Sequence, residues 1–271
     1  MKAKFLILAA VATAITFTAA GCSQSEAIPP YGDEVVGETP EEELPENTPD
    51  EEEDAPEVEV YKRYVTLTAN DVNIRKVAGT SYKVVGAAEK ATSYAYLGEE
   101  GGFYKVWYKN SIAYISKQYS KLSDMRASED EEVEAVIYEG TKLLGTTYIY
   151  GATRYHDGKG NKLRGFSVSA FDCSSLMQYI FYLGADGVLL GVTTRNQVLQ
   201  GEAVKKTDLQ RGDLMFFTNS SRYNKVGVER IGHVALYLGD NLILHTASDY
   251  AKIEKISSTR WSYFIEARRM V

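Results

Sequence analysis

The stretch Phe171-Asp172-Cys173-Ser174-Ser175-Leu176 lies near the middle of the 271-residue chain and decides how its C-terminal half is interpreted. Apolar residues follow the cysteine at helical spacing, at Leu176, Ile180 and Leu183. The spacing predicts a buried helix with Cys173 in its first turn, and Gly184 predicts its C-terminal cap. Because a helix N-terminus carries partial positive charge and free N–H groups, we expect this position to favour a thiolate over a thiol.

Two histidines follow on a pair of predicted strands. His233 begins an apolar stretch that runs to residue 238, and His245 lies in a second stretch over 242–246. The turn signal Gly239-Asp240-Asn241 between them predicts a hairpin. Adjacent antiparallel strands bring side chains within contact range, so the pattern predicts a cysteine nucleophile with two partner histidines.

The N-terminus has the pattern of an export signal. Two lysines precede an apolar run over residues 5–17, which is too short for a good membrane span, and small residues follow up to Gly21-Cys22. This end resembles a bacterial lipobox, so we expect residues 1–21 to be removed and Cys22 to carry a lipid anchor to the membrane. An ordinary cleaved signal is the alternative. In both cases Cys173 is the only other cysteine, and a disulfide within the chain is excluded.

Charge is distributed unevenly along the chain. Residues 23–60 hold fifteen Asp and Glu, no Lys or Arg, and all six prolines, a composition that predicts an extended, disordered tether over 22–60. Residues 61–271 hold 28 basic and 22 acidic residues, a net charge of +6. An anionic polymer such as the cell wall suits this surface, although a generic solvated surface explains it equally well. We expect no nucleic-acid partner.

Residues 61–122 have the pattern of a small all-β barrel. Five or six short apolar stretches alternate with Gly- and Asn-containing turns. The segment resembles a bacterial SH3-like domain through four pieces: Val72-Asn73-Ile74-Arg75, Ser81 to Gly86, Phe103 to Val106 and Ala113 to Ser116. The resemblance implies either binding of cell-wall peptide or a spacer beside a neighbouring active site.

A polar linker is expected over 123–130, followed by the second domain, 128–271. Ser128 to Glu131 fits a capping box, and the apolar spacing after it predicts a helix to about Leu144, ended by Gly145. Residues 154–169 read as a loop, and we expect its histidine, His156, to be exposed. No Cys and His residues stand at metal-ligand spacing, so we expect no metal and no organic cofactor.

Residues 130–271 resemble the NlpC-type (p-sixty) cell-wall cysteine peptidases, which have a papain-like α+β fold. The resemblance rests on four motifs in order: 148–152 (YIYGA), 171–175 (FDCSS), 211–217 (RGDLMFF) and 232–239 (GHVALYLG), with His245 behind the last. The predicted architecture is therefore a papain-like α+β peptidase domain preceded by a small SH3-like barrel.

The resemblance, together with the chemistry, implies a role for each site residue. Cys173 would attack an amide carbonyl, His233 would exchange the proton, and His245 would orient His233 as a neutral partner. Tyr148 matches a tyrosine thought to act at the oxyanion or substrate side, although a core aromatic is the alternative. The remaining two family positions are implied to contact substrate and also suit helix capping: Asp172 and Ser174.

The implied function is an exported, monomeric peptidoglycan DL-endopeptidase of the cell envelope. It would hydrolyse the bond between γ-D-glutamate and the diamino acid of murein stem peptides. Some relatives grip a free amine with an Arg-Asp-Ser run, where this chain has Val192-Thr193-Thr194, which favours stems still attached to glycan. A muropeptide-recycling peptidase or amidase on the same fold, and a non-catalytic wall-binding adaptor, are the alternatives.

Overall fold

The computed structural model describes residues 59–271, so the predicted signal, Cys22 and nearly all of the acidic tether lie outside the described residues. Seven antiparallel strands form the barrel: β1 Tyr61–Leu67, β2 Val72–Arg75, β3 Val84–Ala88, β4 Ser93–Glu100, β5 Phe103–Tyr108, β6 Ser111–Ser116 and β7 Ser120–Arg126. The predicted all-β barrel is confirmed. Within the described residues no helix is long and apolar enough to cross a membrane.

The last barrel strand is longer than the sequence indicated. β7 continues to Arg126 and pairs with β1 over its whole length, through residues that the polarity assigned to a linker. Two contacts hold this polar end: Met125 is buried in the core, and the Asp124 carboxylate accepts two hydrogen bonds from Arg63 at 2.8 and 3.1 Å. Backbone pairing with β1 holds this segment although only Met125 is buried in it, which is why its polarity did not indicate a strand.

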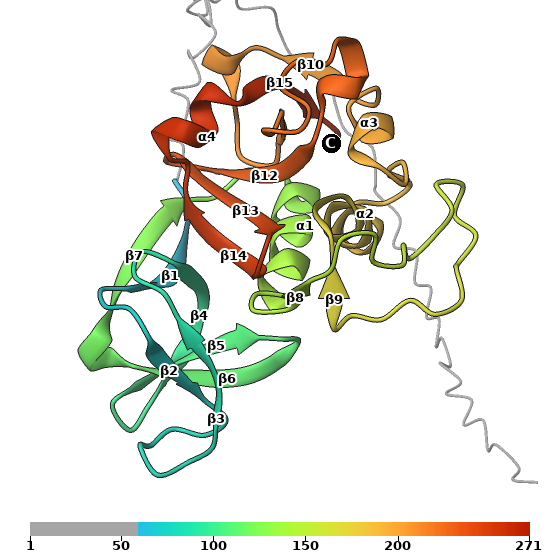
Figure 1. Cartoon of the computed structure of the whole chain (residues 1–271). Helices are drawn as coiled ribbons and strands as arrows, with labels where there is room; N and C mark the ends of the chain where they lie inside the picture. Colours follow the sequence, from blue (N-terminus) through green and yellow to red (C-terminus); the bar gives the residue numbers. More distant parts are fainter. Residues whose placement is uncertain (1–58) are drawn as a thin grey trace, which may run out of the picture. The chain divides into compact units, whose positions relative to one another are not determined.

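Four helices and eight strands follow the barrel. The helices are α1 Glu131–Lys142, α2 Cys173–Gly184, α3 Thr194–Gln197 and α4 Ser258–Ser262. The strands are β8 Thr147–Tyr148, β9 Ala170–Phe171, β10 Glu202–Val204, β11 Leu214–Phe217, β12 His233–Gly239, β13 Leu242–Ala247, β14 Tyr250–Lys255 and β15 Phe264–Arg269. Six of them form an antiparallel sheet in the order β10-β15-β11-β12-β13-β14, beside which α1 and α2 lie (Figure 1). This confirms the predicted α+β class.

The central strands are buried on both faces. Helix α2 packs against β12 and β13, and a second apolar cluster covers other side chains of the same strands. That second cluster contains Met215, Phe217, Ala235, Ile243 and Ile256. A sheet enclosed in this way reads as continuous apolar runs, which is the pattern of β11 and β13.

Helix α1 begins at a different residue from the one expected. Asp130, not Ser128, is the N-cap, and its carboxylate accepts from the N–H groups of Glu132 and Val133 at 2.8 and 3.3 Å. The shift has a simple cause, because Asp130 is itself an excellent cap and three glutamates then occupy the first turn, where the helix dipole favours them. The helix ends at Lys142, two residues before the predicted Leu144.

The barrel contributes to the C-terminal end of α1. The N–H groups of Lys109 and Asn110, in the β5–β6 turn, donate to the carbonyls of Leu144 and Lys142 at 2.8 and 2.7 Å. A Cβ on Gly145, whose φ is +84°, would lie 2.0 Å from the ring of Tyr108. The carbonyls that a helix end leaves without partners are therefore satisfied by the neighbouring domain.

The two helices approach each other closely at Gly184. This glycine is the last residue of α2 and not its cap, since the C-cap is Ala185. A Cβ at Gly184 would lie 2.4 Å from the backbone nitrogen of Val136 on α1. The glycine therefore permits helix packing, and the sequence signal for a helix end had a different physical origin.

Candidate active site

The N-terminus of α2 is closed by a reciprocal capping box. The Asp172 carboxylate accepts from the N–H of Ser175 at 2.8 Å, and the Ser175 hydroxyl accepts from the N–H of Asp172 at 2.9 Å. This pair fixes the entry of the helix and places Cys173 in its first turn, as the sequence predicted.

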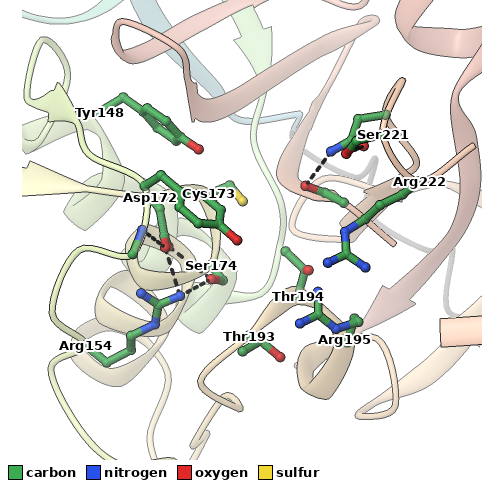
Figure 2. Close-up of a pocket in the computed structure, with 14 residues that line it drawn as sticks. Tyr148, Arg154, Asp172, Cys173, Ser174, Thr193, Thr194, Arg195, Ser221 and Arg222 are labelled. Atoms are coloured by element: carbon green, nitrogen blue, oxygen red, sulfur yellow. Dashed lines mark hydrogen bonds and ion pairs between the residues drawn. The ribbon is translucent and has the colours of Figure 1, made fainter. Parts of the chain in front are cut away.

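Asp172 is also the centre of a buried polar cluster. Its Oδ1 accepts from the Ser174 hydroxyl at 3.0 Å, and its Oδ2 accepts from the N–H of Gly151 at 3.1 Å. Arg154 pairs with the same Oδ2 at 2.8 Å and donates to Ser174 Oγ at 2.9 Å (Figure 2). Asp172 caps the helix, and both Asp172 and Ser174 line a cavity beside Cys173, so the implied substrate contact stays a prediction.

The hairpin of β12 and β13 brings the two predicted histidines together. His233 Nε2 lies 3.0 Å from His245 Nδ1. On the next strand, β14, Glu254 Oε1 lies 2.9 Å from His245 Nε2, and Arg260 Nη2 lies 3.3 Å from the same oxygen. Glu254 was not predicted, and it places a carboxylate behind a partner that the sequence suggested would be neutral.

This chain of contacts sets the protons on both rings. The pKa of Glu254 is about 2; burial raises it, and His245, Arg260 and Lys252 lower it further than burial raises it. An ionised carboxylate only accepts hydrogen bonds, so His245 carries its proton on Nε2 and its Nδ1 accepts. His233 then donates through Nε2, which leaves its Nδ1 without a proton and able to act as a base.

Burial makes Cys173 and the two histidines neutral. It raises the pKa of the Cys173 thiol to about 12, and the Asp172 charge acts in the same direction, whereas the N–H groups of Val234 and Ser174 lower it. Burial also holds the pKa of His233 well below 6.5, and the neighbouring His245 and Arg260 lower it further. Burial likewise lowers the pKa of His245. Burial therefore opposes the thiolate that the helix N-terminus favours.

Two cavities meet at Cys173. The first, about 330 Å³, which we call the arginine-side cavity, is lined by Arg154, Arg195 and Arg222. The second, about 350 Å³, which we call the imidazole-side cavity, is lined by His233, Phe217 and Tyr263. Four residues line both cavities: Tyr148, Cys173, Asn219 and Gly232. The sulfur therefore lies at the middle of a continuous groove, and no barrel residue lines either cavity.

Tyr148 lies beside the cysteine. Figure 2 shows its hydroxyl directed into the cavity on the side of the Cys173 sulfur. Burial raises the pKa of Tyr148, and the Cys173 and Asp172 charges raise it further, so the hydroxyl keeps its proton and can donate. This position favours the predicted oxyanion or substrate role over a core aromatic, although the role itself stays a prediction.

The loop histidine, His156, is in a different place from the one predicted. Its side chain is 0% exposed and is enclosed by the rings of Tyr155 and Tyr182, at centroid distances of 6.4 and 5.4 Å. Its Nδ1 accepts from the N–H of Gly158 at 3.0 Å, and burial lowers its pKa. The polar residues around it in sequence suggested exposure, but the adjacent Tyr155 and, from α2, Tyr182 enclose it. It lines neither cavity of the groove.

Residues 59–271 contain no group of three or more His, Cys, Asp or Glu side chains that could hold a metal ion. The site is thus defined by a buried thiol, a histidine pair backed by a carboxylate, and a tyrosine hydroxyl, all on a papain-like α+β framework. This constellation is that of a thiol-dependent hydrolase.

Residues 145–269 match the model of the NlpC/P60 family and residues 70–121 match that of the bacterial SH3 domain, so the chain carries a domain of each family. The gamma-D-glutamyl-L-lysine dipeptidyl-peptidase of Bacillus subtilis is 28% identical over 202 residues, which are 72% of this chain and 60% of the relative. The peptidoglycan DL-endopeptidase CwlO of Bacillus licheniformis is 29% identical over 148 residues, 54% of this chain and 29% of the relative.

Among solved structures, an NlpC/P60 family protein from Bacillus cereus is 24% identical, with a TM-score of 0.41, and the match covers 77% of this chain and 63% of that one. The chain therefore spans less than two thirds of the length of each of these relatives.

Proposed function

We propose that the protein is a peptidoglycan endopeptidase that hydrolyses the γ-D-glutamyl–diamino acid bond of murein stem peptides with Cys173 as nucleophile. The observation that carries the proposal is the hydrogen-bonded series His233–His245–Glu254, which ends in the same cavity as Cys173. Such a series presents an unprotonated ring nitrogen, and His233 and Cys173 line the same cavity.

The resting pair is a neutral thiol and a neutral imidazole, so the nucleophile forms only as the reaction begins. The thiol proton moves to His233 Nδ1 while sulfur bonds to the amide carbonyl carbon. The C–N bond then breaks, the amine leaves with the proton from His233, and a thioester remains on Cys173. Water, losing a proton to His233, hydrolyses the thioester and restores the thiol.

The tetrahedral intermediate carries negative charge on the former carbonyl oxygen, and hydrogen-bond donors must stabilise that charge. The Cys173 backbone N–H, at the positive end of α2, supplies one donor, and the Tyr148 hydroxyl supplies a second. The buried setting strengthens both contacts, because effective dielectric screening is weak there. His245 holds the imidazole of His233 in the productive tautomer throughout.

The relatives support this substrate class, since they are named as a gamma-D-glutamyl-L-lysine peptidase and a peptidoglycan DL-endopeptidase. Action on peptidoglycan implies a place in the cell envelope. An anchor at Cys22 and a tether over residues 22–60 would let the enzyme reach the wall from the membrane, and both lie outside the described residues.

Digestion of purified peptidoglycan tests the proposal. The protein without residues 1–21 is incubated with intact wall and, separately, with a freed tripeptide stem, and the products are identified by mass spectrometry. We expect release of fragments that begin with the diamino acid, and none with Cys173→Ala. Cleavage at an amide outside the γ-D-glutamyl bond would instead favour an amidase, and wall binding without cleavage would favour an adaptor.

A further inference from the structure

The groove has a direction. His233, which gives its proton to the departing amine, lines the imidazole-side cavity and not the arginine-side cavity. The leaving half of the substrate therefore occupies the imidazole-side cavity, and the acyl half, which stays on sulfur, occupies the arginine-side cavity. If the scissile bond is the γ-D-glutamyl bond of the proposed function, the acyl half ends in D-glutamate with a free α-carboxylate.

Two arginines face this acyl half, and among the described residues they have only one carboxylate between them as an ion-pair partner. Arg195 Nε lies 3.3 Å from Oε1 of Glu229, and Arg222 Nη1 lies 3.0 Å from Oε2 of the same carboxylate. Two positive charges therefore share one negative charge, and the Glu229 side chain is 60% exposed to water. Figure 2 shows both guanidinium groups directed into the cavity.

Arg195 and Arg222 carry N–H groups that form no hydrogen bond within the part of the chain that the structure describes. Both terminal nitrogens of Arg195, and Nε and Nη2 of Arg222, have no hydrogen-bond partner among residues 59–271. Arg154 differs, because it donates to the carbonyls of Val192 and Ala152 and to the Asp172 cluster, so each of its nitrogens is engaged. Arg154 is therefore structural, and the free capacity for an anion lies with the pair.

Arg195 is fixed in relation to the nucleophile. It lies on α3, whose buried Gln197 donates to the carbonyls of Ser174 and Gly191, both at 2.9 Å. Ser174 adjoins Cys173, so a hydrogen bond joins the arginine-bearing helix to the start of α2. Arg222 is held by its own donation to the Glu229 carbonyl at 2.8 Å. The two guanidinium groups are thus held at the wall of the cavity, where they can form charge-assisted hydrogen bonds with a carboxylate.

We propose that Arg195 and Arg222 bind the α-carboxylate of the γ-linked D-glutamate, so that the protein selects stem peptides with this free acid over those in which it is a carboxamide. The inference rests on the proposed function for the identity of the substrate. A guanidinium pair forms charge-assisted hydrogen bonds with a carboxylate, whereas a neutral amide offers a single oxygen and adds two donors that face other donors.

A binding measurement tests the inference apart from catalysis. In a Cys173→Ala background, calorimetry compares L-Ala-γ-D-Glu-L-Lys with the otherwise identical peptide that carries D-isoglutamine, and the pair is repeated with diaminopimelate in place of lysine. We expect the acid to bind about tenfold more tightly than the amide. The preference should weaken with added salt, because both arginines are partly exposed.

Substitutions around the arginine-side cavity should change the preference for the acid peptide in opposite directions. Arg195→Gln and Arg222→Gln each reduce the preference for the acid, and the double variant brings the ratio of dissociation constants close to one. Glu229→Gln removes the internal competitor and strengthens binding of the acid while leaving the amide unchanged. Lys225→Gln is the matched control, since it removes a positive charge from the same loop at an exposed residue outside the cavity.

Equal affinity of the parent protein for acid and amide, or no measurable affinity for either, would overturn the inference. So would an unchanged preference in the double arginine variant. General damage to the loop can be recognised, because it would weaken the binding of both peptides equally. It also cannot produce the gain in affinity for the acid that is expected from Glu229→Gln. Failure of the proposed function looks different, since the active protein would then leave these peptides uncut while the inactive variant still prefers the acid.

Discussion

The two sides of the groove at Cys173 are built in different ways. On the imidazole side, His245 is 1% exposed and both of its ring nitrogens have partners, at 3.0 and 2.9 Å. On the arginine side, Arg195 and Arg222 are 32% and 25% exposed and share one carboxylate. Proton transfer is thus placed where the geometry is fixed, and recognition is placed where a charge can still be exchanged with a ligand.

The supporting elements explain the difference. His233, His245 and Glu254 project from three neighbouring strands of one sheet, whose register fixes their spacing. Arg195 lies on a helix of four residues and Arg222 on the connection between β11 and β12. Groups on sheet strands are held more precisely than groups on loops, so mutations on the imidazole side should change kcat and those on the arginine side KM.

The largest effect is expected at the residue that both sides share. Cys173→Ala removes the atom that forms the thioester and should lower kcat/KM by at least about 10⁴-fold, while peptide affinity is retained. Stopped assays of amine release, paired with calorimetry, measure the two quantities. Activity within tenfold of the parent would show that the groove works without this sulfur.

Removal of the buried ring behind His233 should cost less. His245→Ala frees His233 to rotate and to adopt the wrong tautomer, so kcat should fall by about 10²-fold with little change in KM. His156→Phe is the matched control, because that histidine is equally buried but lies outside the groove, and its kcat should equal the parent's. If the two variants behave alike, His245 has only a packing role.

Loss of the carboxylate should have a smaller effect and change the pH profile. Glu254→Gln lets an amide donate to His245 Nε2, which weakens the tautomer control, so kcat/KM at pH 7 should fall about tenfold. The Glu254 charge and its hydrogen bond raise the pKa of His245, so the acidic limb of the profile should move to lower pH in the variant. Glu266→Gln, which removes a partly buried carboxylate that pairs with Arg268 on β15, serves as control. A uniform loss at every pH would indicate a structural role alone.

The smallest effect concerns stability against pH. All three histidines have pKa values lowered by burial, so below about pH 6.5 the unfolded chain binds protons that the folded chain does not. The free energy of unfolding should therefore fall as pH drops, by up to about 1.4 kcal/mol per pH unit for each histidine. Urea unfolding at pH 7, 6 and 5 measures the slope. His233→Asn should reduce that slope, and an unchanged slope would contradict the neutral resting state.

Cys173, with its raised pKa, has the opposite dependence. Above about pH 9 the unfolded chain loses a proton that the folded chain keeps until about pH 12, so stability should fall as pH rises through this interval. Cys173→Ala should show a smaller alkaline loss of stability than the parent, because tyrosines whose pKa values are raised by burial contribute the remainder.

The sequence was sufficient for the cysteine helix, the histidine hairpin and the barrel, because each has a local signal. Period 3.6 follows Cys173, a Gly-Asp-Asn turn joins the two histidine strands, and short alternating stretches make the barrel. Glu254 was out of reach, because one acid on a polar strand, Tyr250–Lys255, looks like a solvated surface until the strand pairs with β13.

Burial explains the other two differences between the sequence predictions and the structure. Asp, Gly and Lys residues next to His156 predicted exposure, yet the adjacent Tyr155 ring and the ring of Tyr182, distant in sequence, enclose it. The helix N-terminus at Cys173 predicted a thiolate, yet desolvation depends on what packs around the sulfur, and short-range sequence does not contain that information. Local patterns thus identified the elements, and tertiary contacts set the ionisation states.

The most direct test of the account is capture of the acyl-enzyme. The protein without residues 1–21 is mixed with L-Ala-γ-D-Glu-L-Lys, quenched in acid within milliseconds to seconds, and its intact mass and peptide map are measured. We expect a mass increase equal to the L-Ala-γ-D-Glu acyl group, located on Cys173 and absent from Cys173→Ala. Turnover of the peptide with the acyl group on another residue, or an unchanged yield of product from Cys173→Ala, would contradict it.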